Sequence, residues 1–330
     1  MDIASDSLDV GGGGASLGQG SPSGHAAPPV ARTFLDSLID AGILIPTGVD
    51  GIYGRSRVYE AIAEGMDALI TEIGADQQAE MMRFPPTTPR NDFEDSEYLK
   101  SFPQLAGIVH SFCGNDHEHF RLVARLERGE DWTDQLRPTR VVLTPAACYP
   151  VYPVLARRGP LPPEGRVVDV FSYCFRHEPS IEPTRMQMFR MREYVRLGTP
   201  EQILAFRQMW IERGQKLADD LEVPHTLDLA NDPFFGRGGK LVADNQRDLK
   251  LKFELLIPVN DGAPPTACMS FNYHVDHFST VWPLRTADGE KAHTGCAAFG
   301  IDRLTLALLR NHGLDLSGWP RGVRALLGGI

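Results

Sequence analysis

Hydrophobic and polar positions alternate in a short stretch near the middle of the chain. Phe171, Tyr173 and Phe175 occupy every second position, a period typical of a strand with one buried face. The segment EPSIEPT at residues 178–184 carries two prolines, which predicts a loop. Alternation returns over residues 186–197, which predicts a second, antiparallel strand. Together these patterns predict a hairpin over residues 171–198.

Charged residues lie between the apolar positions of this hairpin. On one of its faces they would point into a cavity, and an unpaired buried charge is costly, so we expect a ligand of opposite charge. Arg suits phosphate because its planar group binds two oxygens at once. A surface hairpin with salt bridges is the alternative, since exposed charge alternation is common. The charged positions are Arg176, Glu178, Glu182, Arg185, Arg190, Arg192 and Glu193.

Three longer segments have the period of amphipathic helices. The first runs from the N-cap Ser56 to Gly74, and the second covers residues 199–222, where Thr199 and Gln202 resemble a capping box. The third begins at Leu304. A shorter helix is expected within residues 33–42, and residues 92–130 are expected to be mostly helical and polar. Further strands are expected at 78–86, 139–144, 250–258 and 266–272, the last two paired with each other.

Length and composition indicate a globular protein of one large core. The chain has 330 residues, of which 42% are hydrophobic and 23% charged. Residues 1–31 are rich in Gly, Ser, Ala and Pro and are expected to be a disordered tail, whereas residues 32–330 are expected to form a single domain. No apolar run is long enough for a membrane span. Five irregularly spaced cysteines do not form a disulfide framework and favour the reducing cytoplasm. A formal net charge of −10 argues against a non-specific nucleic-acid binder.

Two motifs in this order resemble class II aminoacyl-tRNA synthetases. Phe175-Arg176-His177-Glu178, followed by Phe189-Arg190, resembles their motif 2, and residues 295–303 (GCAAFGIDR) resemble their motif 3. The helix, strand and proline of residues 56–86 look like motif 1, which forms the dimer interface in that family. The resemblance implies an α+β fold, with an antiparallel sheet flanked by helices, and a homodimer.

The motifs also imply an ATP site. Arg176 would hold the α-phosphate, Glu178 would read the adenine amino group, Phe189 would stack on adenine, and Arg303 would reach the γ-phosphate. Magnesium would accompany ATP, with Glu254 and Asp276 as candidate ligands. The remaining residues that the resemblance assigns to the nucleotide are Arg185, Met186, Lys252, Ala267, Cys268, Met269 and Ser270.

Three distant residues match the zinc ligands of methanogenic-type seryl-tRNA synthetases. Cys148, Glu193 and Cys296 stand at the corresponding places, and thiolate and carboxylate are suitable zinc ligands that would leave one position open. The resemblance implies that this position takes the amino group of the substrate amino acid, and it makes Glu193 a substrate-site residue. The alternative is that both cysteines are buried core thiols, as we expect for Cys113, Cys174 and Cys268. The spacing of Cys113, His117 and His119 matches no closed zinc site.

The acceptor of the activated amino acid is a separate question. Over roughly residues 50–318 the chain resembles the methanogenic-type seryl enzyme, but residues 1–31 show no heptad pattern of a tRNA-binding arm. Amino acid:[carrier protein] ligases fit this pattern. That resemblance implies activation of a small amino acid, glycine or sometimes alanine, and transfer to the phosphopantetheine thiol of a carrier protein that would dock within about 199–247, with no tRNA. A stand-alone aminoacyl-tRNA synthetase and a regulatory paralogue without turnover are the alternatives.

Overall fold

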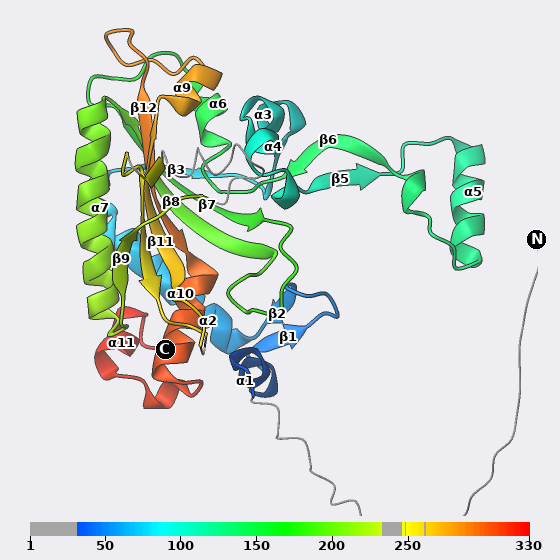
Figure 1. Ribbon diagram of the computed structural model, residues 1–330, viewed down its shortest axis with the longest axis horizontal. Helices are drawn as coiled ribbons and strands as arrows, with labels where there is room; N and C mark the ends of the chain where they lie inside the picture. Colours follow the sequence, from blue (N-terminus) through cyan, green and yellow to red (C-terminus); the bar gives the residue numbers. More distant parts are fainter. Residues whose placement is uncertain (1–31, 233–245, 248, 261) are drawn as a thin grey trace, which may run out of the picture. The chain divides into compact units, whose positions relative to one another are not determined.

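The predicted hairpin lies inside a seven-stranded sheet in the computed structural model (Figure 1). The sheet has the order β3-β7-β8-β12-β11-β10-β9; β3 is parallel to β7 and every other neighbouring pair is antiparallel. The strands are β3 (Glu80–Arg83), β7 (Arg166–Phe175), β8 (Met188–Gly198), β9 (Thr226–Leu229), β10 (Lys252–Ile257), β11 (Thr266–Val275) and β12 (His293–Gly300).

The structure describes residues 32–232, 246, 247, 249–260 and 262–330. The tail predicted at residues 1–31 and residues 233–245 of the predicted docking segment lie outside these ranges. The described residues from Thr33 to Ile330 belong to one compact unit. Within the described ranges, every helix is too short or too polar to cross a membrane.

Three helices cover one face of the sheet: α2 (Arg57–Ile73), α7 (Pro200–Asp220) and α10 (Ile301–His312). Trp210 of α7 is fully buried between Tyr194 of β8 and Phe299 of β12. α7 therefore belongs to the core of the domain, and a docking role for it would fall on its outer face. The opposite face of the sheet packs against α6 (Val151–Ala156) and α9 (His277–Val281).

α2 and α7 begin and end close to where the sequence predicts, whereas α10 begins at Ile301, three residues before the predicted Leu304. The Ser56 side chain accepts a hydrogen bond from the backbone N–H of Tyr59, and Gly74 is the C-cap of α2. Both hydrogen bonds of the Thr199–Gln202 capping box are present at the start of α7. The predicted pairing of residues 250–258 with 266–272 is confirmed as β10 and β11.

The prediction for residues 92–130 is wrong in part. After α3 (Arg90–Asp95) and α4 (Tyr98–Ser101), the chain forms the four-residue strand β5 (Ile108–Ser111) before α5 (Asp116–Glu127). β5 pairs with β6 (Arg137–Leu143), which also pairs with β4 (Thr87–Pro89). A strand this short contains too few residues to establish a period, and the partner that stabilises it lies beyond α5 in the sequence.

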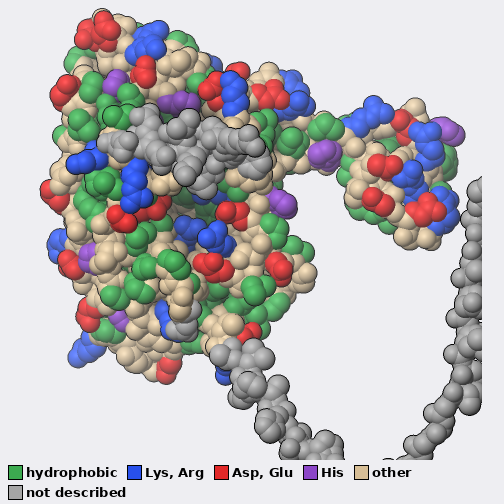
Figure 2. Space-filling model, in the orientation of Figure 1, with side chains coloured by type: hydrophobic (Ala, Val, Ile, Leu, Met, Phe, Trp, Pro, Cys, Tyr) green, Lys and Arg blue, Asp and Glu red, His purple; other side chains and the backbone are tan. Residues whose placement is uncertain are grey.

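The β5–β6 hairpin and α5 extend away from the seven-stranded sheet (Figure 1). None of the α5 residues is buried. On the face shown in Figure 2, Lys and Arg side chains are interspersed with Asp and Glu over this extension and over the rest of the surface. The remaining elements of the described residues are α1 (Phe34–Asp40), β1 (Leu44–Pro46), β2 (Tyr53–Arg55), α11 (Arg321–Leu326) and short 3₁₀ turns at 75–77, 103–105, 133–135 and 316–318.

Candidate active site

Two cavities adjoin at strands β8, β11 and β12, and we name each by one of its residues. The Arg303 cavity has a volume of about 110 Å³ and the Cys296 cavity about 490 Å³. Six residues line both cavities, so molecules bound in the two cavities would lie next to each other. The shared residues are Arg176, Met191, Asp232, Lys252, Ser270 and Ala298.

The Arg303 cavity gathers the side chains that the sequence assigned to a nucleotide. They come from the loop and strand of motif 2, from β10, from β11 and from α10, which are far apart in the sequence. Each of the predicted nucleotide residues lines this cavity: Arg176, Glu178, Arg185, Met186, Phe189, Lys252, Ala267, Cys268, Met269, Ser270 and Arg303.

Two arginines of this cavity have no carboxylate partner among the described residues. Arg176 donates from Nε to the backbone oxygen of Pro145 at 3.1 Å, and its guanidinium lies 5.4 Å from the centre of the Phe189 ring. Arg303 donates to the backbone oxygens of Thr184 and Ala267 at 3.0 and 2.9 Å. Burial, partly offset by Cys268, lowers the pKa of Arg303, and the positive charge of Arg176 acts in the same direction. A buried site with unpaired positive charge is suited to an anion.

Two arginines on the second strand of the hairpin, Arg190 and Arg192, are paired within the protein, so the predicted anionic ligand is wrong for them. Arg192 binds Asp169 through Nε and Nη2 at 3.0 and 2.7 Å, and it also donates to Asp67. Arg190 binds Asp302 and Glu60. Periodicity placed these arginines correctly on one face but could not show that helices α2 and α10 and strand β7 supply their carboxylates.

Lys252 sits at the border of the two cavities between two carboxylates. Its Nζ lies 2.5 Å from Asp232 and 3.0 Å from Glu254. Burial alone would raise the pKa of Asp232, but Lys252 and Gln246 hold it below its usual value. Asp232 was missed by sequence reasoning because it follows β9 without any motif. Glu254 lines the Arg303 cavity, whereas Asp276, the other magnesium candidate, lies elsewhere and pairs with Lys291 at 3.2 Å.

Cys148, Glu193 and Cys296 meet at the wall of the Cys296 cavity. Glu193 of β8 and Cys296 of β12 come from adjacent strands, and the backbone N–H of Cys148 donates to Glu193 Oε1 at 3.0 Å. A hydrogen bond between the two thiols, together with burial, raises the pKa of Cys148 well above its usual value. Burial also raises the pKa of Glu193, although hydrogen bonds with both thiols oppose this.

These three residues fit a metal ion by their chemistry. Glu193 is 1% exposed and forms no ion pair with a described cation. A metal ion would therefore supply the positive charge that compensates this buried carboxylate. As the side chains stand, no three His, Cys, Asp or Glu residues in the described ranges are arranged to hold a metal. Instead, the Glu193 carboxylate accepts a hydrogen bond from the backbone N–H of Cys148, and Cys296 Sγ accepts one from Asn272 Nδ2 at 3.2 Å.

Sequence reasoning missed two polar residues beside Cys296. Asn272 pairs with Cys296 across β11 and β12, and His274 Nε2 lies 3.7 Å from Cys296 Sγ. Burial lowers the pKa of His274 to about 3, which keeps its imidazole neutral. A signal was present in the sequence: Ser270, Asn272 and His274 alternate with Phe271 and Tyr273, as on a strand with one polar face.

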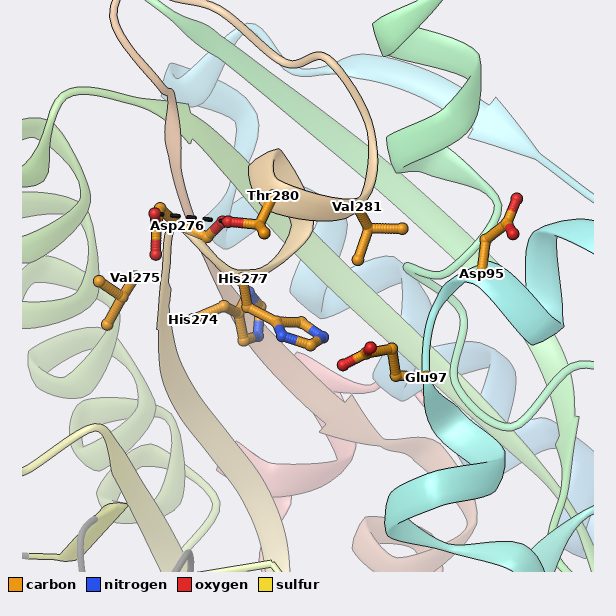
Figure 3. A pocket seen from close by; sticks show the side chains of 8 residues that line it. All are labelled: Asp95, Glu97, His274, Val275, Asp276, His277, Thr280 and Val281. Carbon is orange, nitrogen blue, oxygen red and sulfur yellow. Dashed lines mark hydrogen bonds between the residues drawn. The ribbon is translucent and has the colours of Figure 1, made fainter.

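A third cavity opens beside the second and is shown in Figure 3. This His277 cavity has a volume of about 610 Å³, and it shares Glu97, His274 and His277 with the Cys296 cavity. The rings of His274 and His277 lie close together, and the Glu97 carboxylate points toward them from the start of α4 (Figure 3). The three cavities thus follow one another across the sheet.

Comparison with known proteins places the chain in a family. No family model matches the chain. It is 50% identical over 306 residues to amino acid--[acyl-carrier-protein] ligase 1 of Bradyrhizobium diazoefficiens, a match that covers 93% of both chains. It is 49% identical over 303 residues to ligase 2 of the same organism, covering 92% of this chain and 90% of that one.

The fold agrees with this relationship. The crystal structure of M. kandleri SerRS in complex with A. aeolicus tRNASec matches with a TM-score of 0.76 at 22% identity, covering 89% of this chain and 59% of that one. The predicted α+β fold of class II synthetases is therefore confirmed, as is the resemblance to the seryl enzymes. By its similarity to both Bradyrhizobium enzymes, the chain belongs to the family of amino acid--[acyl-carrier-protein] ligases.

Proposed function

We propose that this enzyme uses ATP to activate a small amino acid, glycine or alanine, and transfers it to the phosphopantetheine thiol of a carrier protein. One observation carries the proposal: Arg176 has no carboxylate partner among the described residues and stands where the Arg303 and Cys296 cavities adjoin. An anion on each side of this guanidinium would be neutralised by it. The names of the two Bradyrhizobium relatives supply the carrier protein as acceptor.

In the activation step, the amino acid carboxylate attacks the α-phosphorus of ATP and pyrophosphate leaves. Arg176 would neutralise charge at the α-phosphate, and Arg303 would hold the γ-phosphate that departs with pyrophosphate. The nucleophile is already ionised, so positioning and charge neutralisation are the enzyme's main contribution. Phe189 would support adenine, because its aromatic ring lines the Arg303 cavity.

The metal ions belong to the same proposal. Cys148, Glu193 and Cys296 would hold zinc, which when bound supplies a Lewis acid for the amino group of the amino acid. Glu254 is our candidate for a magnesium that accompanies ATP, because it lines the Arg303 cavity and Asp276 does not.

In the transfer step, the thiol sulfur attacks the aminoacyl carbonyl carbon. A carbon–sulfur bond forms, the bond from that carbon to the phosphate oxygen breaks, AMP leaves, and the thiol proton passes to solvent. The His277 cavity supports this step because it borders the Cys296 cavity and offers room for an arm that carries a thiol. Together the two cavities are much larger than glycine requires.

A homodimer through the motif 1 segment also belongs to the proposal. β3 is an edge strand of the sheet, and its Met81 side chain is 65% exposed. An exposed apolar side chain on an edge strand favours contact with another chain.

Replacing Arg176 or Arg303 should strongly slow activation. For Arg176→Ala and Arg303→Ala we expect amino acid-dependent ATP–pyrophosphate exchange to fall by a factor of about 10² to 10³, because each change removes a preorganised charge from the site. Arg158→Ala is the control, since Arg158 pairs with Glu80 at the surface. Each amino acid is tested separately. If the folded, zinc-loaded wild type exchanges with none, the activation proposal is wrong and a regulatory role becomes the better one.

The zinc proposal predicts a joint loss of metal and activity. Cys148→Ala and Cys296→Ala should each lower bound zinc, measured by mass spectrometry of the purified protein, together with exchange activity. The control is Cys113→Ala: the expectation that Cys113 is a core thiol is wrong, since it is an exposed free cysteine that lines none of the three cavities. Zinc that stays bound in both cavity variants would place the ion elsewhere.

Narrowing the His277 cavity should separate the two half-reactions. In His277→Trp, a larger ring would obstruct the cavity, so we expect slower aminoacylation of a carrier protein and unchanged ATP–pyrophosphate exchange. His277→Ala is the matched control and should keep both. Equal loss of exchange and transfer would contradict this route, and charging of tRNA in place of a carrier protein would contradict the acceptor.

The dimer proposal predicts a change in mass at the sheet edge. Wild type should sediment as a dimer in analytical ultracentrifugation, and Met81→Glu should shift it toward monomer, because the change places a charge in an apolar contact. A wild type that sediments as a monomer at micromolar concentration contradicts the proposal.

A further inference from the structure

A second group of buried charges borders the Arg303 cavity, and two of its members, Asp302 and Arg190, line that cavity. Its centre is Asp302, the second residue of α10, which is 2% exposed. Asp302 Oδ1 accepts from Arg190 Nη2 at 2.8 Å and from Tyr59 Oη at 3.0 Å, and Arg55 Nε lies 3.1 Å from the same oxygen. Glu60 completes the group, since its Oε2 lies 2.5 Å from Arg190 Nη1. Two carboxylates therefore balance two guanidinium groups.

The second oxygen of Asp302 reaches the backbone of the hairpin. Asp302 Oδ2 accepts from the backbone N–H of Arg190 at 2.5 Å. A carboxylate that binds both the side chain and the backbone of one residue fixes the position of that stretch of β8, and it does so from the first turn of α10.

Asp302 and Arg190 each stand next to a proposed ATP residue in the sequence. Arg303 follows Asp302, and Phe189 precedes Arg190. Arg55 extends the group toward the same hairpin, since its Nη2 donates to the backbone oxygen of Met188 at 3.0 Å. Tyr59 and Glu60 belong to α2, the helix of the proposed dimer segment.

We propose that Asp302 is a positioning residue for ATP: by binding Arg190, it fixes the distance between Phe189 on β8 and Arg303 on α10. The adenine and the γ-phosphate are opposite ends of one ligand. Their two contacts must therefore be held at a constant separation, and Asp302 is the direct bridge between the two elements that carry them. The proposal rests on the proposed ATP site.

The alternative is that this group only stabilises the fold, and the protein offers a matched control. Asp169 is likewise a buried carboxylate that binds an arginine of β8, namely Arg192, two positions after Arg190. Neither Asp169 nor Arg192 lines the Arg303 cavity. Asp169→Asn and Asp302→Asn thus remove the same charge from similar environments, but only Asp302 adjoins the proposed ATP contacts.

The test compares three proteins: wild type, Asp302→Asn and Asp169→Asn. The Kd for ATP is measured by calorimetry, the KM for ATP and for the amino acid by pyrophosphate exchange, the Tm by scanning calorimetry, and zinc by mass spectrometry. We expect both variants to lower Tm. Asp302→Asn should in addition weaken ATP about tenfold, with unchanged zinc and amino acid KM, because residues coupled through one network contribute on this scale. Asp169→Asn should bind ATP as wild type does.

A result in which Asp302→Asn and Asp169→Asn weaken ATP equally, or not at all, overturns the proposal. If Asp302→Asn does not fold, Glu60→Gln decides, since it loosens Arg190 from a half-exposed position and should weaken ATP in the same direction. Wild-type ATP affinity in Glu60→Gln would then overturn it. A wild type that binds ATP but exchanges with no amino acid contradicts the proposed function alone, because the comparison of Kd values still stands. A wild type that binds no ATP contradicts both.

Discussion

Charge burial on the central strand β8 is the constraint on which the site depends. Three charged residues of this strand are almost inaccessible: Arg190 is 5% exposed, and Arg192 and Glu193 are 1% exposed each. Removing one partner of a buried ion pair costs about 3–5 kcal/mol, because it leaves a charge uncompensated in the interior. Each of the three therefore needs a compensating group, and the strand's alternation decides where that group can come from.

The two faces of β8 meet this requirement differently. Arg190 and Arg192 point toward the helices, where Asp302, Glu60, Asp67 and Asp169 pair with them. Glu193 points to the other face, where, among the described residues, two thiols and a backbone N–H bind it. On the helix-facing side, the charges of β8 are thus neutralised by carboxylates of the protein itself. On the other side, the Glu193 carboxylate has no cation in contact among the described residues. The strand that holds the sheet to its helices is thus also the strand that carries Glu193, our proposed zinc ligand.

The sequence predicts a feature of this site only when the residues that determine the feature lie close together in the chain. Helix caps at Ser56 and Thr199, and the strands around Phe175 and Phe189, depend on neighbours in the chain, so local pattern sufficed. The candidate ATP and zinc residues came from resemblance to a family, and the fold brings them to adjoining cavities. Asp232 and the pairing of Arg190 with Asp302 depend on contacts between distant strands and helices, and no period or spacing encodes those.

The net charge of the chain is a poor guide to its ligand for the same physical reason. A charge of −10 argued against nucleic acid, yet the cavities present Arg176 and Arg303 without carboxylate partners among the described residues. Many of the other arginines and lysines form pairs with the more abundant Asp and Glu. A bound anion interacts mainly with the unpaired charged groups inside its cavity, because the low dielectric constant there strengthens each interaction. The net charge of the exposed surface matters less, because solvent and salt screen it. An acidic enzyme can therefore hold a polyanionic substrate such as ATP, provided that some arginines of the cavity, here Arg176 and Arg303, form no ion pair with the carboxylates that also line it.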